Sequence, residues 1–234
     1  MENLYFQSQE HFSIYLRSLE FIGSGSESDC YKTANNLVLK HLCGPAYEPK
    51  TKEELLQFKD VAIKNYVFNK ALVYIKDEIV GVLMPYINGR TLEKNLYKVK
   101  ILNIVRALDD LMIATKKLSN LGIHVFDVCD VNTIYNNSKF FLIDTMFYEK
   151  VAVDPNQLFR QNMKSIIINI YEKIIPYEIL VFISTIDEIK DFVEDTELLI
   201  NPSYVLKVLL DELNKYMGIE VKTMEEASKK LIKS

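Results

Sequence analysis

The chain has few of the residues that build disulfide frameworks and zinc sites. It contains three cysteines, Cys30, Cys43 and Cys129, and three histidines. The cysteines are odd in number and lack the spacing of metal ligands, so a structural zinc site is not expected. Free thiols in a reducing cytosol explain them more simply, and we therefore expect a cytoplasmic protein.

Long apolar runs and strong net charge are also lacking. No stretch approaches the roughly 18 apolar residues that a membrane-spanning helix needs, and no signal peptide follows the first residues. The formal net charge is -4, and no basic run is dense enough to offset it. We therefore expect no membrane span and no nucleic acid as the main partner.

The first eight residues are set apart from the fold. Residues 2–8 read ENLYFQS, which matches a protease-cleavage tag used in recombinant expression. About 225 residues remain, which is enough for one large domain or two closely packed lobes with a sizeable core.

The pattern of apolar residues changes near residue 90. Before it, short β-branched or aromatic runs predict strands, interrupted by one helix with an N-cap at Thr51 and with Leu55, Phe58 and Ala62 at helical spacing. After it, most of the chain has helical periodicity. The predicted strands are 18–22, 37–42, 71–75 and 79–86, and the predicted helices after residue 90 are 100–121, 157–175, 177–192, 202–217 and 223–232.

The turn-forming residues Asn88, Gly89 and Arg90 separate these two parts. We therefore expect an α+β protein with a small β-rich lobe, residues 9–87, a larger helical lobe, residues 88–234, and a cleft between them.

The segment 122–145, GIHVFDVCDVNTIYNNSKFFLIDT, carries the strongest chemical signal. Asp127 precedes Asn132 by five residues, and Asp144 follows twelve residues later. The apolar runs 133–135 and 140–143, separated by the turn 136–138, predict a hairpin that brings the three polar residues to one end. Two acids and an amide can hold divalent metal ions and orient a hydroxyl, as phosphoryl transfer from a nucleotide requires.

The N-terminal part carries two weaker signals. Gly23-Ser24-Gly25 forms a turn whose backbone could approach phosphate oxygens, although such turns usually only connect strands. Lys40 lies on an apolar strand and needs a polar partner, for which a nucleotide phosphate and Glu54 are suited. The plainer alternatives are a lysine reaching solvent from an edge strand and a solvated acid in a first helical turn; Glu53 is the second choice of partner and fits the latter better.

Taken in order along the chain, these residues resemble the protein-kinase-like superfamily, in a small and divergent form of bacterial or viral type. The resemblance implies a two-lobed kinase-like fold that binds ATP and Mg²⁺. Asp127 would be the catalytic base, Lys40 and Glu54 the catalytic ion pair, and Asn132 and Asp144 the metal ligands. The segment 81–89 resembles the fifth strand and hinge, with Met84 as gatekeeper and with the carbonyl of Pro85 and the N–H of Ile87 reading adenine. The implied nucleotide contacts are Gly23, Ser24, Gly25, Cys30, Val38, Lys40, Met84, Pro85 and Ile87.

The chain also departs from that pattern. Ser28 replaces the third loop glycine, Val125 and Phe126 replace the usual His-Arg pair, and Cys129 replaces a phosphate-contacting lysine. Thr145-Met146 follows Asp144 in place of Phe-Gly, and the segment that follows is short, so activation-loop phosphorylation is not expected.

Three hypotheses remain. The first is an atypical phosphotransferase that acts on a hydroxyl of a protein or small molecule. The second is a pseudokinase that binds nucleotide or protein without catalysis, and the third is an interaction domain in which the matches arise by chance. The acidic residues at 187–195 could attract a basic substrate, but a solvated helix face is the commoner role for such a cluster.

Overall fold

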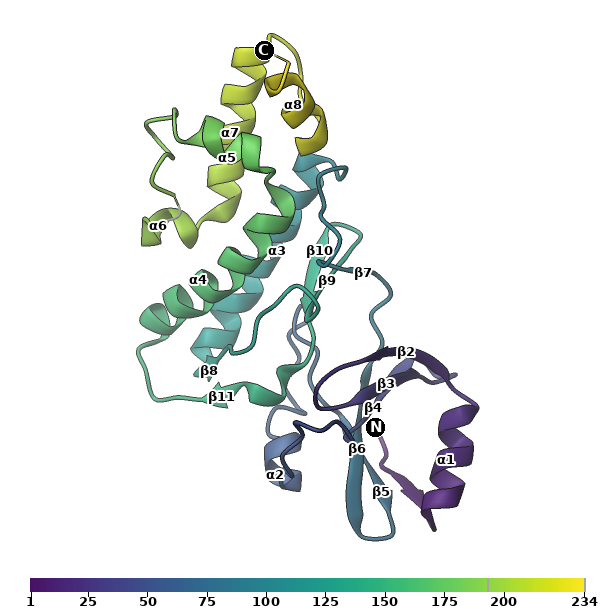
Figure 1. Cartoon of the computed structure of the whole chain (residues 1–234). Coiled ribbons are helices and arrows are strands. Elements are labelled where there is room, and N and C mark those ends of the chain that lie inside the picture. The colour runs from purple at the N-terminus through teal and green to yellow at the C-terminus, as the bar shows by residue number, and fades with distance from the viewer. Residues whose placement is uncertain (193, 234) are drawn as a thin grey trace. The chain divides into compact units, whose positions relative to one another are not determined.

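The computed structural model describes residues 1–192 and 194–233 and has a mixed α+β fold. The chain divides into two compact units (Figure 1). The first unit contains residues 1–62, 66–88 and 144–146. The second unit contains residues 63–65, 89–143 and 147–234.

The first unit is built on a six-stranded sheet with the strand order β1-β5-β6-β4-β3-β2. The pairs from β5 to β2 are antiparallel, whereas β1 pairs with β5 in parallel. Its elements are β1 (Leu4–Phe6), α1 (Gln9–Arg17), β2 (Glu20–Ser24), β3 (Asp29–Lys32), β4 (Leu37–His41), α2 (Lys52–Leu55), β5 (Ala71–Ile75) and β6 (Glu78–Pro85). The four predicted strands are therefore confirmed, with shifts of one or two residues at most ends.

One face of this sheet packs against α1, a helix that the sequence analysis did not predict. Ser8 caps the helix by accepting a hydrogen bond from the backbone N–H of His11. Phe12 is fully buried among sheet residues that include Leu39, Val73 and Leu83. The helix was missed because its apolar face is narrow and its first turn adjoins the tag sequence.

The expectation that residues 1–8 take no part in the fold was wrong. Leu4–Phe6 forms the parallel edge strand β1 beside β5. The ring of Tyr5 stacks on Tyr74 at 5.0 Å, and Phe6 packs against Phe12 and Tyr15. A strand edge offers unpaired backbone groups, and an attached aromatic segment can pair with them.

The helix after Thr51 is shorter than predicted. Thr51 is the N-cap, as expected, and forms a capping box with Glu54. The helix α2 nevertheless ends at Leu55, and Phe58 and Ala62 lie outside it. The side-chain amide of Asn69 donates to the carbonyl of Leu55 at 3.1 Å. That carbonyl would otherwise accept the next helical hydrogen bond, so a tertiary contact takes the place of helix propagation.

The second unit is mostly helical. The long helix α3 buries one face, including Leu108 and Leu111, and ends before Gly122, whose φ of +70° terminates it as predicted. No helix among the described residues is both long and apolar enough to cross a membrane. The elements are β7 (Arg90–Thr91), α3 (Ile101–Asn120), β8 (Ile123–His124), β9 (Thr133–Asn136), β10 (Lys139–Leu142), the 3₁₀ turn η1 (Thr145–Phe147, which begins in the first unit), β11 (Glu149–Lys150), α4 (Pro155–Ile174), α5 (Tyr177–Ile183), α6 (Thr196–Leu199), α7 (Pro202–Met217) and α8 (Met224–Leu231).

The predicted hairpin is confirmed as β9 and β10. Asn137 and Ser138 form a two-residue loop with φ of +44° and +58°, which matches the twist of an antiparallel hairpin. On its other side, β9 pairs with β7, so the strand that follows Gly89 joins the same small sheet.

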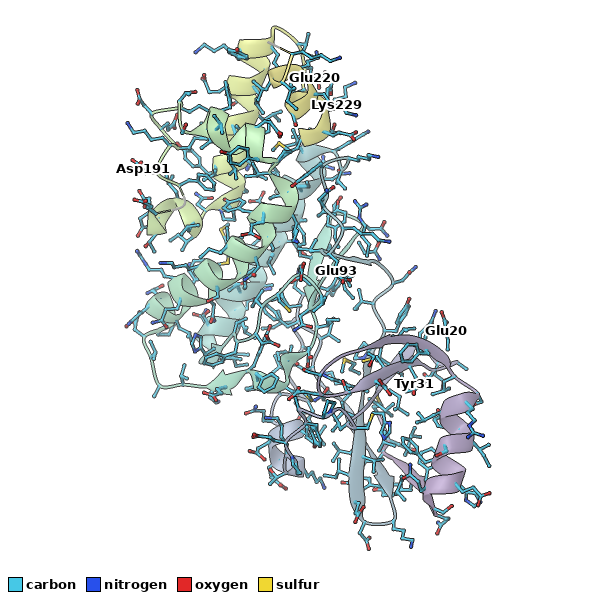
Figure 2. The ribbon with its side chains drawn as sticks, viewed as in Figure 1. Glu20, Tyr31, Glu93, Asp191, Glu220 and Lys229 are labelled. Atoms are coloured by element: carbon cyan, nitrogen blue, oxygen red, sulfur yellow. The ribbon has the colours of Figure 1, made fainter. Side chains whose placement is uncertain are left out.

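The predicted helix 177–192 is interrupted. Helix α5 ends at Ile183, and turns lead to the short helix α6. The acids of this region have local partners: Asp187 pairs with Lys190, Glu188 accepts from the hydroxyl of Tyr204, and Asp195 caps α6. Figure 2 marks Asp191 in the same connection. These contacts favour a structural and solvated role for the acidic cluster.

Candidate functional site

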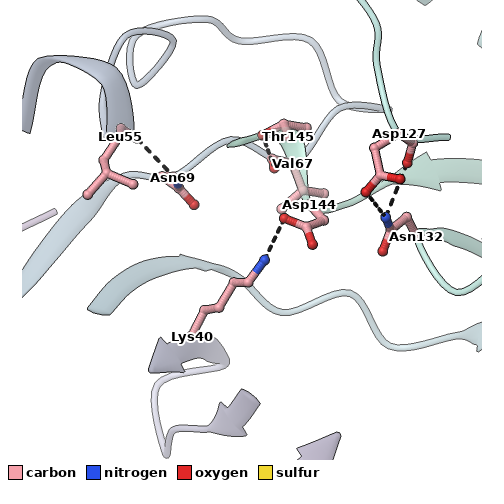
Figure 3. Close-up of polar contacts among 8 residues, drawn as sticks. All are labelled: Lys40, Leu55, Val67, Asn69, Asp127, Asn132, Asp144 and Thr145. Atoms are coloured by element: carbon pink, nitrogen blue, oxygen red, sulfur yellow. Dashed lines mark hydrogen bonds and ion pairs between the residues drawn. The ribbon is translucent and has the colours of Figure 1, made fainter. Parts of the chain in front are cut away.

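Lys40 is the most buried of the charged residues that the sequence analysis assigned to the site. It lies on β4 and is 4% exposed. Its ammonium pairs with the carboxylate of Asp144, with 2.5 Å between Nζ and Oδ1 (Figure 3). These residues are 104 positions apart, so the pair is a tertiary contact within the first unit. Charges held this far from water persist only when they are paired.

The strand register places Cys30 beside Lys40 on the neighbouring strand β3. Burial raises the pKa of the Cys30 thiol, and the nearby Lys40 ammonium partly opposes that rise. The thiol therefore stays protonated at neutral pH, and Cys30 offers an uncharged surface next to the ion pair.

Glu54 does not reach Lys40. Its carboxylate accepts hydrogen bonds from the backbone N–H of Thr51 at 2.6 Å and from the Thr51 hydroxyl at 2.7 Å. These bonds lower the pKa of Glu54. The expected pair of Lys40 with Glu54 is therefore replaced by the pair of Lys40 with Asp144, and Glu54 has the role of a helix-capping acid.

The predicted turn at Gly23-Ser24-Gly25 begins later than expected, because Gly23 and Ser24 belong to β2 and pair in register with Cys30 and Asp29. Gly25 donates its backbone N–H to the carbonyl of Ser28 at 2.9 Å, and the Ser24 hydroxyl donates to Asp29 at 2.7 Å. A Cβ added at Gly23 would meet no atom within 4 Å, and one at Gly25 would meet only the Ser28 carbonyl at 4.0 Å. The fold therefore does not itself demand glycine at these two positions.

The segment implied to read adenine continues from β6. Val38 pairs in register with Met84, which is buried, and Leu37 pairs with Pro85. Beyond the strand, Tyr86 donates its backbone N–H to the carbonyl of Asn36 at 3.0 Å, and Ile87 is half-buried. Val38, Met84, Pro85, Ile87 and Lys40 thus belong to adjacent strands or their direct extension.

In the second unit, Asp127 and Asn132 are brought together. The Asn132 amide donates to the carboxylate of Asp127 at 3.1 Å and to its backbone carbonyl at 3.2 Å (Figure 3). The Asn132 carbonyl in turn accepts a hydrogen bond from the N–H of Ile143 at 2.9 Å. The five-residue spacing thus closes a compact loop ahead of the hairpin.

Two of the implied acids have unusual backbone geometry. Asp127 has a φ of +51° and Asp144 a φ of +59°. Left-handed backbone is uncommon outside glycine, although aspartate tolerates it better than most residues. Strain of this kind concentrates at functional sites, because a packed surrounding must hold it.

Asn162 on α4 is a residue that the sequence analysis missed. It is fully buried, accepts from the N–H of Val125 at 2.9 Å, and donates to the carbonyl of Ile123 at 2.9 Å and to the Ser119 hydroxyl at 3.1 Å. These bonds fix the chain just before Asp127. A polar residue on the apolar face of a predicted helix was the available signal.

A second support of this loop is the ion pair between Asp130 and Lys173, with 3.0 Å between Nζ and Oδ2. The hydrogen bond from Lys173 lowers the pKa of Asp130, and the same bond raises the pKa of Lys173. Cys129 lies between these anchors, and burial raises the pKa of its thiol. Cys129 is therefore a neutral residue where the resemblance would place a cation.

An open hollow lies beside Asp127 within the second unit. It is lined by His124, Val125, Phe126, Asp127, Val128, Ser165, Ile168 and Asn169. Asp127 is the carboxylate among these residues, and the rest of the lining consists of one histidine and of aromatic, aliphatic and uncharged polar side chains.

No known protein family matches the sequence of this chain, and no curated protein matches it either.

Proposed function

We propose that the chain is an atypical kinase-like phosphotransferase with a two-lobed kinase-like fold, which moves the γ-phosphoryl group of ATP to a hydroxyl. The observation that carries the proposal is the buried pair of Lys40 with Asp144. A lysine buried on a sheet and an acid that follows a hairpin are the two residues that the kinase resemblance assigns to phosphate and metal.

Each implied residue has a definite task in this proposal. Lys40 would bind the α- and β-phosphates and would exchange part of its contact with Asp144 for phosphate oxygens. Asp127 would accept the proton of the attacking hydroxyl and orient it in line with the γ-phosphorus. The backbone of Gly23–Gly25 would lie close to the phosphates.

Asn132 and Asp144 fit a magnesium ion by their chemistry. The Asn132 nitrogen already donates to Asp127, so its oxygen is the atom suited to a cation. Asp144 offers its second carboxylate oxygen beside the one that contacts Lys40. Both are hard oxygen ligands, which Mg²⁺ prefers, and the ion would neutralise charge on the transferred phosphoryl group.

The acceptor is a hydroxyl of a protein or of a small molecule. Apart from Asp127 and His124, the hollow is lined by uncharged side chains, which supports an acceptor without strong charge near the reacting oxygen. The acids near residue 190 are used in local contacts, which does not support a basic peptide as the preferred substrate.

The test is ATP turnover with Mg²⁺, with and without cell extract as a source of acceptor. Asp127→Ala should lower phosphoryl transfer by at least about 100-fold, because the general base supplies 10²–10⁴-fold. Asp211→Ala, which removes an exposed acid on α7, is the matched control and should be silent. Equal transfer by Asp127→Ala and the control would refute the proposal.

A second candidate is a pseudokinase that binds nucleotide without transfer. The contact of Glu54 with Thr51 favours it, since Lys40 then lacks the helix glutamate that positions it in active kinases. Thermal stabilisation by ATP, with no transfer in the presence of Mg²⁺ and extract, would select this candidate.

A further inference from the structure

The sheet of the first unit carries a second group of chemically active side chains on the face opposite Lys40. Successive residues of a strand point to opposite faces, so His41 faces away from the side that Lys40 occupies. The ring of His41 contacts Phe12 of α1 edge-on at 5.0 Å. This group is therefore separate from the proposed nucleotide residues on Lys40's side of the sheet.

Asp29 and Cys43 lie on the same side as His41. The register of β3 with β4 pairs Asp29 directly with His41, and Cys43 is two residues beyond His41. One carboxylate oxygen, one imidazole nitrogen and the sulfur all lie within 4.8 Å of one another. Two strands and the residue after the second one thus converge on three metal-binding atom types.

The separation of two of these atoms suits a tetrahedral ion. Cys43 Sγ and Asp29 Oδ2 are 3.6 Å apart. With zinc–sulfur of about 2.3 Å and zinc–oxygen of about 2.0 Å, tetrahedral geometry separates sulfur and oxygen by about 3.5 Å. The sulfur and the oxygen are therefore already at the separation that a tetrahedral ion needs, and the imidazole nitrogen needs to approach them by no more than about 1.5 Å.

The surroundings hold two of the three groups in place. The Ser24 hydroxyl donates to the other carboxylate oxygen of Asp29 at 2.7 Å, as an outer hydrogen bond to a ligating carboxylate does. Contact with Phe12 restricts the ring of His41. Cys43 is exposed, so the position next to it is open to solvent.

We propose that Asp29, His41 and Cys43 bind one zinc-class cation, with a fourth coordination position open to water. Thiolate and imidazole ligands select Zn²⁺ or Co²⁺ over Mg²⁺ and Ca²⁺, which take oxygen ligands. Cys43 binds as the thiolate, and its proton passes to solvent. The thiol–carboxylate hydrogen bond explains Asp29 and Cys43, and the contact with Phe12 explains the position of the His41 ring, whereas a cation would use all three ligand atoms at once.

Such an ion would join β3, β4 and the segment after β4. Through Asp29 it would also fix Ser24, the last residue of β2, which precedes Gly25. The ion would therefore stabilise the first unit and the residues Gly23–Gly25, to which the proposed function assigns phosphate binding. The zinc site does not depend on that function.

The test is zinc binding to the whole chain, measured by competition with a chromophoric chelator and by the cobalt spectrum. We expect one equivalent of Zn²⁺ per chain, a thiolate-to-cobalt charge-transfer band with Co²⁺, and a rise in melting temperature with Zn²⁺. Cys43→Ser should abolish the band, and Cys43→Ser and His41→Gln should each weaken zinc binding by at least about 10-fold.

The matched controls are Cys30→Ser and His11→Gln, because neither residue belongs to the group of Asp29, His41 and Cys43. Cys30→Ser is used to compare the number of zinc ions bound per chain. Both should bind zinc like the parent chain. Cys43 is exposed, so Cys43→Ser should fold, and far-UV circular dichroism without zinc checks this for each variant. A Co²⁺ form without the thiolate band, or zinc binding that Cys43→Ser and His41→Gln leave unchanged, would overturn the proposal.

Discussion

At the scale of single residues, burial decides how much each charge matters. Lys40 has a side chain 5% exposed, whereas that of its partner Asp144 is 22% exposed. If Asp144 is removed, the ammonium stays buried without a partner, whereas an unpaired Asp144 can still reach water. The two halves of one ion pair should therefore differ in their contribution to stability.

We predict that Asp144→Ala lowers the free energy of unfolding by about 3–5 kcal/mol, and that Lys40→Met lowers it by less. The double variant should regain part of the loss, because it leaves no unpaired charge. Urea unfolding of the three variants measures this. A larger loss for Lys40→Met than for Asp144→Ala would contradict the argument from burial.

The space around each glycine shows whether the fold itself requires glycine at that position. A Cβ at Gly44 would lie 2.2 Å from the carbonyl oxygen of Ser26, whereas Gly23 and Gly25 have room for one. The end of β2 and the residue after it, Gly23 and Gly25, therefore need small side chains only if a ligand approaches them closely.

We predict that Gly23→Ala and Gly25→Ala change stability by no more than about 0.5 kcal/mol but weaken ATP binding. Gly44→Ala should destabilise the fold by about 1–3 kcal/mol, because the backbone must shift to relieve the overlap. Thermal unfolding and nucleotide titration distinguish the two effects. Unchanged ATP affinity in both turn variants would argue against phosphate binding there.

At the scale of elements, helix α4 positions the loop that carries Asp127. Its buried residue Asn162 makes three hydrogen bonds to the segment 119–125. Lys173, in the last turn of the helix, pairs with Asp130. The helix therefore fixes the loop on both sides of Asp127, and both contacts lie within the second unit.

We predict that Asn162→Ala costs about 2–4 kcal/mol of stability, because it leaves the Val125 N–H and the Ile123 carbonyl buried without a partner. Asn169→Ala on the same helix is the matched control, since the hydrogen bond of its amide goes to the Ser165 carbonyl one turn away on α4. It should cost less than about 1 kcal/mol. Equal losses in chemical denaturation would show that Asn162 does not anchor the loop.

At the scale of the whole molecule, one buried phenol links the stability of the fold to alkaline pH. Tyr171 is 6% exposed and packs edge-on against Phe192 at 5.0 Å. Within the part of the chain that the structure describes, its hydroxyl has no hydrogen-bond partner. Burial raises the pKa of Tyr171 above its ordinary value of 10.0, because the charged form cannot be solvated.

Because the pKa of Tyr171 is raised in the folded state, the fold loses stability at alkaline pH. The folded state keeps the phenol neutral, so its contribution is complete below pH 10.0 and is lost as the pH rises above it. We predict that Tyr171→Phe is more stable at pH 7 by about 1 kcal/mol, since it removes a buried hydroxyl without a partner. It should also lose less stability than the parent chain above pH 10.0.

The measurement is urea unfolding across that pH range, with Tyr216→Phe as the control. Tyr216 is 60% exposed, so Tyr216→Phe removes a phenolic hydroxyl without changing the buried core. The same slope for Tyr171→Phe and the parent chain would contradict the prediction.

Features that depend on neighbouring residues could be predicted from the sequence alone. Periodicity and local stop signals placed α3, α4 and α7, and the turn at Asn137 and Ser138 placed the hairpin. The five-residue spacing placed Asn132 against Asp127, because a loop that short leaves few arrangements. Local interactions encode such features within one stretch of chain.

Features that depend on residues far apart in the sequence became visible only in the folded chain. Asn69 binds the carbonyl at the end of α2, and Thr51 donates to Glu54. Asp144 pairs with Lys40, from which it is 104 positions away in the sequence. The cysteine and histidine counts gave no sign that Asp29, His41 and Cys43 meet, because strand register joins the first two. Pairing between distant strands and the competition for buried polar groups are properties of the packed chain, so no local pattern records them.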